Sequence, residues 1–361
     1  MGVPLFDPAT PLAGLRRRLG EAIDEVLDRG QFILGPEVGA FEHELAAYLR
    51  IEHAVGVANG TEALTIALRA LGVGPGDDVV VPSFSFYASA EAVPPTGARP
   101  VFCDVDPDTY CATPDTVKAA LTPRTKAVIA VDLFGNVAPV RAIEALGVPV
   151  VEDAAQAVGS TGPDGRAGAL GTLATLSFYP SKNLGAFGDG GAVTTADAAL
   201  AERVRMLRFH GSRDKVSYEE VGYNSRLDEL QAAILRVQLP ELERWATHRH
   251  GVGERYAQAG LGELVALQGI PPGTRPAWHV YVVRHERADD LAAALQAAGI
   301  GSRAYYRTPI HRQPAMAAFA GAELPATDEL ARTHLALPVS AAMRRDQVDE
   351  VVGAVRDARL D

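Results

Sequence analysis

The 361-residue sequence has few cysteines, no long apolar run and a deficit of positive charge. Its two cysteines, Cys103 and Cys111, are too few for a disulfide framework and lack metal-ligand spacing, so we expect a reducing cytoplasm and no metal site. No stretch approaches the roughly 20 apolar residues of a membrane helix, and the N-terminus lacks the basic and apolar regions of a signal peptide. We therefore expect no membrane partner. The formal net charge of −11 disfavours nucleic acid as a partner.

What the sequence does contain is an alternation of short β-rich runs and helical stretches over residues 54–195, after two helices expected within 11–50. This alternation is typical of an α/β domain with a mostly parallel sheet and helices on both faces. The expected strands cover 78–81, 100–103, 127–131, 149–151, 174–178 and 192–194.

The C-terminal third has a different pattern, which predicts a smaller α+β domain. Residues 227–245 read as one long helix that leaves the first domain. Strands are expected over 278–283 and 303–306, and helices over 288–298 and 347–356. We place the domains at 1–240 and 241–361.

Two segments combine small residues with polar groups where strands would end. Gly60 and Thr61 open a helix whose free amides could bind one phosphate group, although an ordinary helix N-cap explains them as well. The run 150–156 begins as a strand and continues into Asp153, which could pair with a cationic ring nitrogen. Alternatively, Asp153 caps a following helix.

A lysine lies between a predicted strand and a glycine-rich turn, in Ser-Phe-Tyr-Pro-Ser-Lys-Asn-Leu-Gly (177–185) followed by Gly-Asp-Gly-Gly (188–191). Apolar surroundings lower the pKa of a lysine, and glycines let backbone approach a flat ligand. A neutral Lys182 amine suits Schiff-base chemistry; a solvated surface lysine is the alternative. A fourth segment, 222–235, is largely an apolar helix preceded by Asn224, Ser225 and Arg226.

The order and spacing of these segments resemble the DegT/DnrJ/EryC1/StrS family of sugar aminotransferases. The likeness runs from Gly-Gln-Phe-Ile-Leu-Gly-Pro (30–36) to Pro-Ile-His (309–311), and both the lysine segment and Gly-Tyr-Asn-Ser-Arg-Leu-Asp-Glu-Leu-Gln-Ala-Ala (222–233) are close to family signatures. The resemblance implies a fold-type-I architecture, with a large, mostly parallel seven-stranded sheet domain and a smaller C-terminal domain. It also implies pyridoxal 5'-phosphate as cofactor, with pyridoxamine 5'-phosphate as an intermediate.

The resemblance further implies roles for individual residues. Lys182 would hold the cofactor as an internal aldimine, and Asp153 would pair with its protonated pyridine nitrogen. Gln156 would lie near the ring hydroxyl, and Phe86 would stack on the ring. The phosphate would be held by Gly60, Thr61 and Ser177. Asn224 would reach that phosphate from a neighbouring subunit, which implies a homodimer with shared active sites. Candidate substrate contacts are Arg213, Lys215, Tyr306 and His311.

The implied reaction transfers an amino group from L-glutamate to a nucleotide-linked keto-deoxy-sugar, as in the biosynthesis of amino sugars for polysaccharides or antibiotics. The segments 210–212 and 222–226 look more like the 3-keto branch than the 4-keto branch. Dehydratase relatives carry histidine in place of the lysine, which argues against that branch. The alternatives are an aminotransferase for a cyclitol ketone or an aromatic amino acid, and a non-enzymatic ligand sensor on the same scaffold.

Overall fold

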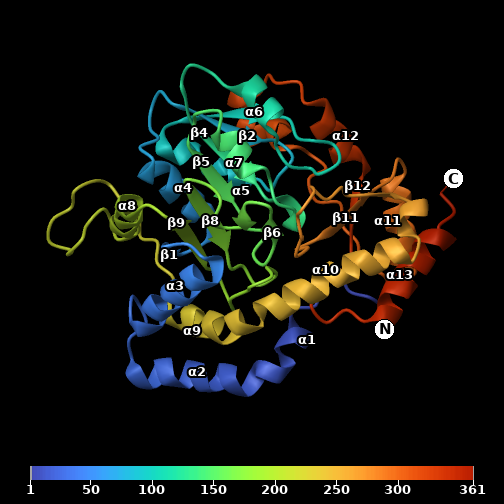
Figure 1. The fold of residues 1–361 in the computed structure, drawn as a ribbon, viewed down its shortest axis with the longest axis horizontal. Helices are drawn as coiled ribbons and strands as arrows, with labels where there is room; N and C mark the ends of the chain where they lie inside the picture. Colours follow the sequence, from blue (N-terminus) through green and yellow to red (C-terminus); the bar gives the residue numbers. More distant parts are fainter. Residues whose placement is uncertain (1, 361) are drawn as a thin grey trace.

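A seven-stranded sheet forms the centre of the computed structural model, which describes residues 2–360 (Figure 1). Its strand order is β1-β9-β8-β5-β4-β2-β3. The strands are β1 (His53–Val57), β2 (Asp78–Pro82), β3 (Arg99–Cys103), β4 (Thr125–Val131), β5 (Val150–Asp153), β8 (Leu173–Ser177) and β9 (Gly191–Thr195). Strand β9 pairs antiparallel with both neighbours, and the other pairs are parallel. The predicted α/β fold with a mostly parallel seven-stranded sheet is confirmed.

Helices cover both faces of this sheet because its central strands are apolar on both sides. Alternate residues of β2 enter different cores. Val79 packs in a core shared with α4 (Gly60–Ala70) and α8 (Ala198–Arg208). Val80 packs in a second core with α3 (Pro36–Leu49) and α9 (Glu229–Gln238). The remaining helices before α8 are α1 (Ala9–Leu12), α2 (Arg16–Arg29), α5 (Ala88–Glu91), α6 (Pro114–Ala120) and α7 (Val140–Glu144).

A second, three-stranded sheet lies in the C-terminal part, with the order β10-β11-β12. Its elements are α10 (Leu242–Gln258), β10 (Ala266–Leu267), β11 (Tyr281–Arg284), α11 (Ala288–Ala297), α12 (Pro325–Thr333), β12 (His334–Leu337) and α13 (Arg345–Asp357). Val3 belongs to the apolar core of this part, and its carbonyl accepts a hydrogen bond from the Gly301 amide at 2.8 Å. The N-terminal residues therefore pack with the C-terminal elements, and the boundary at residue 240 stays a prediction.

Two element predictions are wrong. The expected helix over 227–245 is two helices, α9 and α10, because the chain passes through a short 3₁₀ turn at Leu239–Glu241. Pro240 lies in that turn and has no amide hydrogen to continue the α-helical pattern. The expected strand over 303–306 is reduced to one bridge between Arg303 and Ala336. Among the described residues, no helix has the length and apolar character needed to cross a membrane.

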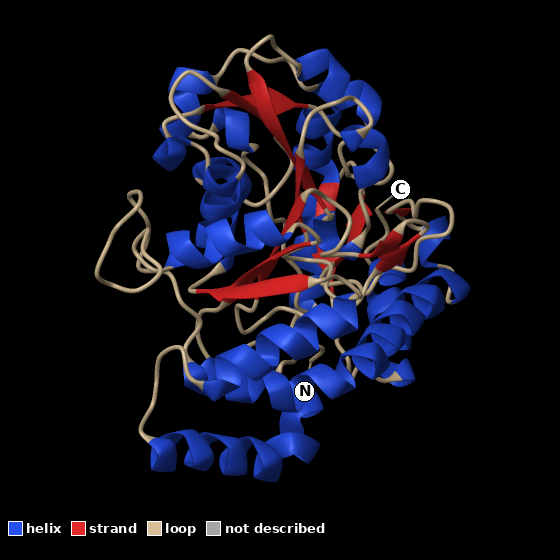
Figure 2. Cartoon of the chain, turned by 60° about the vertical axis from the view of Figure 1, so that its left-hand side comes forward, coloured by secondary structure: helices blue, strands red, loops and turns tan. Residues whose placement is uncertain are grey.

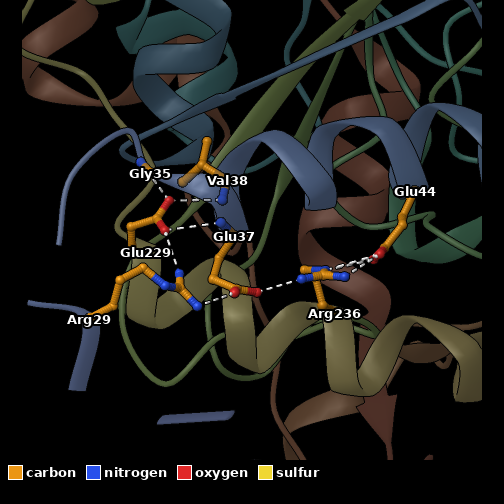
Figure 3. Close-up of polar contacts among 7 residues, drawn as sticks. All are labelled: Arg29, Gly35, Glu37, Val38, Glu44, Glu229 and Arg236. Atoms are coloured by element: carbon orange, nitrogen blue, oxygen red, sulfur yellow. Dashed lines mark hydrogen bonds and ion pairs between the residues drawn. The ribbon is translucent and has the colours of Figure 1, made fainter. Parts of the chain in front are cut away.

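One of the two acidic residues of the 222–233 motif, Glu229, joins α9 to the beginning of α3 (Figure 3). Helix α3 has no side-chain cap of its own, so its first amides need acceptors from elsewhere. The buried Glu229 carboxylate accepts hydrogen bonds from the amides of Gly35, Glu37 and Val38 at 2.8–3.0 Å. Glu229 also forms an ion pair with Arg29, and Arg236 of α9 forms one with Glu44 of α3. This motif residue therefore anchors the fold.

Candidate active site

The candidate residues come together where strands β2, β5 and β8 end, at one edge of the sheet. Parallel strands present their carboxyl ends at the same edge, which is where ligands bind in open α/β sheets. Asp153 is the last residue of β5, and Ser177 is the last residue of β8. Lys182 follows β8 by five positions (182 − 177 = 5), in the turn that leads back to β9.

Asp153 is buried, with 5% of its surface exposed, and both of its oxygens accept hydrogen bonds. Ser89 donates its hydroxyl to Oδ2 at 2.8 Å, and the Ala155 amide donates to Oδ1 at 3.2 Å. Ser85 lies 2.9 Å from Ser89 between the hydroxyl oxygens. An ionised carboxylate only accepts hydrogen bonds, so the Ser89 hydroxyl donates its hydrogen bond to Asp153. In the contact between the two serines, Ser85 must then be the donor and Ser89 the acceptor. No helix follows Asp153, so the helix-cap explanation is wrong.

Lys182 and Asp153 influence each other's charge. Burial lowers the pKa of Lys182 to about 8, and the nearby Asp153 carboxylate opposes that shift. Burial also raises the pKa of Asp153, against the hydrogen bond from Ser89, the Ala155 amide and the charge of Lys182. A partly buried amine with a pKa near 8 has a neutral fraction at physiological pH, as Schiff-base chemistry requires. The surface-lysine explanation does not fit this environment.

The beginning of α4 lies against the end of β8. A Cβ built on Gly60 would lie 2.8 Å from Ser177 Cβ, so a larger residue would displace the serine. Asn59, rather than Thr61, caps the helix by accepting from the Glu62 amide at 2.9 Å. The amides of Gly60 and Thr61 belong to the first turn, where helices leave such donors without intrahelical acceptors. Together with the Ser177 hydroxyl, they form a small polar cradle that fits a phosphate group.

Gln156 lies two residues beyond the Ala154 amide that closes β5, and both ends of its side-chain amide are occupied. It accepts from the Phe134 amide and donates to the Tyr306 hydroxyl, each at 3.0 Å. Tyr306 stacks on the Phe134 ring with centroids 5.7 Å apart. Tyr306, a predicted substrate contact, is thus hydrogen bonded to Gln156, a predicted cofactor contact. Phe86, after β2, has 57% of its surface exposed, so its ring is open to a stacking partner.

Four predicted residues share no hydrogen bond or ion pair with these site residues in the described part of the chain. Asn224 is exposed in the loop between α8 and α9, which projects from the body of the molecule (Figures 1 and 2). In the same loop, Arg213 pairs with Glu219 at 2.8 Å, and the Lys215 ammonium lies 4.8 Å from the Phe209 ring centroid. His311 is buried, and its Nδ1 lies 2.7 Å from the Ser83 hydroxyl, just after β2.

Ser89 is the site residue that sequence reasoning missed. Its spacing of four from Ser85 places both hydroxyls on one face of a helical turn, which was a readable signal. Its partner, Asp153, is 64 positions away, and only the fold brings the two together.

Comparisons with known proteins identify the family of the chain. The sequence model of the DegT/DnrJ/EryC1/StrS aminotransferase family matches residues 15–356. The dTDP-3-amino-3,4,6-trideoxy-alpha-D-glucose transaminase of Streptomyces venezuelae is 46% identical over 364 residues, covering 98% of this chain and 96% of the relative.

Solved structures show the same fold over the whole chain. The structure of S. venezuelae DesV in complex with a ketimine intermediate has a TM-score of 0.96 and 45% identity, and covers 100% of this chain and 99% of that one. Bacillus subtilis NtdA with bound cofactor PMP has a TM-score of 0.91 and 29% identity, and covers 99% and 85%.

The family match and the shared fold define a pyridoxal-phosphate-dependent aminotransferase. The chain belongs to the DegT/DnrJ/EryC1/StrS aminotransferase family. Its cofactor is pyridoxal 5'-phosphate, with the pyridoxamine form as the intermediate carrier of the amino group.

Proposed function

We propose that this enzyme transfers the amino group of L-glutamate to the ketone of a nucleotide-linked 3-keto-deoxy-sugar. In the overall exchange, glutamate becomes 2-oxoglutarate and the sugar ketone becomes an amine. The observation that carries the proposal is the position of Lys182 and Asp153 at the carboxyl edge of the sheet, where the charge of each acts on the pKa of the other. A 3-keto substrate is supported by the S. venezuelae relative, whose name is that of a 3-amino-sugar transaminase.

The residues present fit the cofactor. The cradle of Gly60, Thr61 and Ser177 would hold its phosphate, the exposed Phe86 ring would stack on its ring, and Asp153 would face its ring nitrogen. When bound, pyridoxal phosphate supplies an aldehyde and an electron-withdrawing ring. The side-chain NH₂ group of Gln156 donates a hydrogen bond to the Tyr306 hydroxyl. The ring hydroxyl of the cofactor would therefore join an existing hydrogen bond network.

The chain itself supplies proton transfer and charge. The Lys182 amine, with its pKa lowered to about 8, takes and returns protons close to neutral pH. Ser89 and the Ala155 amide donate to Asp153 and favour its charged form, against the effect of burial. Its position is therefore fixed before a ligand binds. Fixed charges of this kind stabilise a transition state without reorganising during the reaction.

The diphosphate of the nucleotide needs positively charged contacts, although the net charge of the chain is −11. We propose that Arg213 and Lys215, on the projecting loop, contact it. Tyr306 lies close enough to Gln156 to line the sugar site. His311 would act through Ser83, because its ring is buried against that hydroxyl.

We also propose that the enzyme is a homodimer in which Asn224 of each subunit reaches the cofactor phosphate in the other subunit. The projecting loop exposes Val216, Tyr218 and Val221, which are 61–83% exposed and lack an apolar cover in one chain. Light scattering should report twice the chain mass of 38.1 kDa. Val221→Asp should shift the particle towards one chain and lower activity, whereas the exposed-site control Asp164→Asn should do neither. A monomer with full activity would contradict the proposal.

Absorbance spectra and a substrate panel test the function. Purified protein should be yellow, and L-glutamate should bleach the visible band. A panel of dTDP-, UDP- and GDP-linked 3- and 4-keto sugars then identifies the acceptor, with 3-keto sugars restoring the band fastest. Restoration by 4-keto sugars alone would refute the 3-keto assignment, and restoration by a cyclitol ketone alone would refute the nucleotide-sugar assignment.

Both cysteines are free and buried, which is consistent with the reducing cytoplasm we propose as its location.

A further inference from the structure

A cavity of about 360 Å³ lies beside the lysine segment. Its wall includes Lys182 from that segment and Trp245 and Arg249 from α10. Ligand sites for small molecules typically span roughly 300–1,000 Å³, so the cavity suits a compact metabolite. None of the phosphate-cradle residues lines it, and neither does Asp153. The cavity is thus a neighbour of the proposed cofactor site, with Lys182 shared between them.

Arg249 is a buried cation without a carboxylate partner. Only 7% of its surface is exposed. Its Nη1 donates to the carbonyls of Trp278 and Val339 at 3.0 and 3.3 Å. Its Nε has no hydrogen bond partner in the described part of the chain. Burial lowers the pKa of Arg249 to about 10, and no acidic group opposes that shift. A buried charge left uncompensated in this way is costly.

Trp245 adds a second donor that lacks an acceptor. Its indole Nε1 is buried and has no hydrogen bond partner among the residues described. Residues four apart on a helix share one face, so Trp245 and Arg249 both reach the cavity from the same side of α10. A carboxylate accepts several hydrogen bonds at once and matches the edge of a guanidinium.

Neither of the other titratable groups nearby, His279 and Asp7, forms an ion pair with Arg249. Burial and the charges of Lys182 and Arg249 hold the pKa of His279 well below its usual value, so His279 is neutral at physiological pH. Asp7 is the acidic residue of the cavity wall, and its Oδ1 accepts from the Thr10 amide at 3.0 Å. A carboxylate ligand in the cavity would supply the acceptor that Arg249 Nε lacks in the described part of the chain.

We infer that Arg249 and Trp245 bind a carboxylate group of the amino donor in this cavity. The inference rests on the proposed function, because an amino-acid donor carries both a carboxylate and the amine that must reach Lys182. One cavity wall presents groups for both. The acceptor sugar does not need this carboxylate site, so the two half-reactions should depend on Arg249 unequally.

The two tryptophans of the chain report directly on the cavity, since Trp245 lines it and the Trp278 carbonyl binds Arg249. The full chain, before cofactor is added, is titrated with 2-oxoglutarate while tryptophan fluorescence is recorded. The wild type should show a saturable change. Arg249→Gln should weaken binding by about tenfold or more, as expected for a lost charge-assisted contact. Arg244→Gln, an exposed arginine of the same helix, is the matched control and should bind as the wild type does.

Two further variants keep the test decisive if Arg249→Gln does not fold. Arg249→Lys keeps the charge but loses the planar fork, and Trp245→Phe keeps the ring but loses the N–H, with Trp278 left as reporter. Both should bind 2-oxoglutarate more weakly than the wild type while melting at a similar temperature. Unchanged affinity in both variants would overturn the inference.

The cofactor-loaded enzyme then separates the inference from the proposed function. Arg249→Gln, or Arg249→Lys in its place, should need about tenfold more glutamate for half-maximal bleaching, with the KM for the keto-sugar unchanged. If glutamate bleaches wild type and variant at the same concentration, the donor site lies elsewhere, although the enzyme is still an aminotransferase. If no visible band forms at all, the proposed function fails, and the fluorescence titration still decides the carboxylate site.

Discussion

Replacing Lys182 by alanine is expected to abolish transamination, with turnover falling by about 10⁴-fold. This residue has two tasks on the proposed route, attachment of the cofactor and movement of a proton, and no other lysine lines the cavity beside it. The visible absorbance band should disappear or shift, since the cofactor would be held only by the phosphate cradle and ring contacts. Single-turnover absorbance after mixing with glutamate measures the loss directly.

Borohydride treatment provides the matching chemical test. In the wild type it should fix the cofactor to the peptide that contains Lys182, which mass mapping identifies. Lys118→Ala removes an exposed lysine on α6 and should leave both the band and the adduct unchanged. An adduct on any other lysine, or full activity in Lys182→Ala, would rule out the proposed role.

Much of this site could be predicted from short sequence segments, because the strand ends and the turn that carry its residues are determined by nearby residues. A β-branched run ending in Asp153 predicts a strand with an acid at its end, and glycines around the lysine predict a tight turn. Parallel order then brings both to one edge. The sheet prediction held for the same reason, although β1 at the sheet edge was not among the expected strands.

Contacts between distant segments could not be predicted in this way. Arg249 occupies a helix whose pattern looks ordinary, and only the fold shows that no carboxylate faces it. Gln156 reads as a free amide, yet Tyr306 reaches it from 150 positions away. The strand expected at 303–306 did not form because Tyr306 stacks on Phe134 instead of extending a ladder. Tertiary packing overrode local preference there.

Asp153→Asn is expected to lower turnover by about two orders of magnitude, since a hydrogen bond to a charged group contributes about 1.5–3 kcal/mol. Asparagine keeps the shape, because its Oδ1 can accept from the Ala155 amide while its Nδ2 donates to the Ser89 hydroxyl, but it brings no negative charge to the ring nitrogen. The loss should appear in the rate of bleaching by glutamate rather than in the amount of cofactor bound. Asp164→Asn, at an exposed position, should leave that rate unchanged.

The same substitution should spare the stability of the cofactor-free protein. Burial disfavours the charge of Asp153, as its raised pKa shows, so a neutral amide removes a cost of folding while keeping a partner for Ser89. We therefore expect the melting temperature of Asp153→Asn to equal or exceed that of the wild type. Active sites commonly hold such a charge at the expense of stability. A large fall in melting temperature together with the fall in rate would mean that Asp153 acts as a structural residue, and its assignment to the ring nitrogen would be wrong.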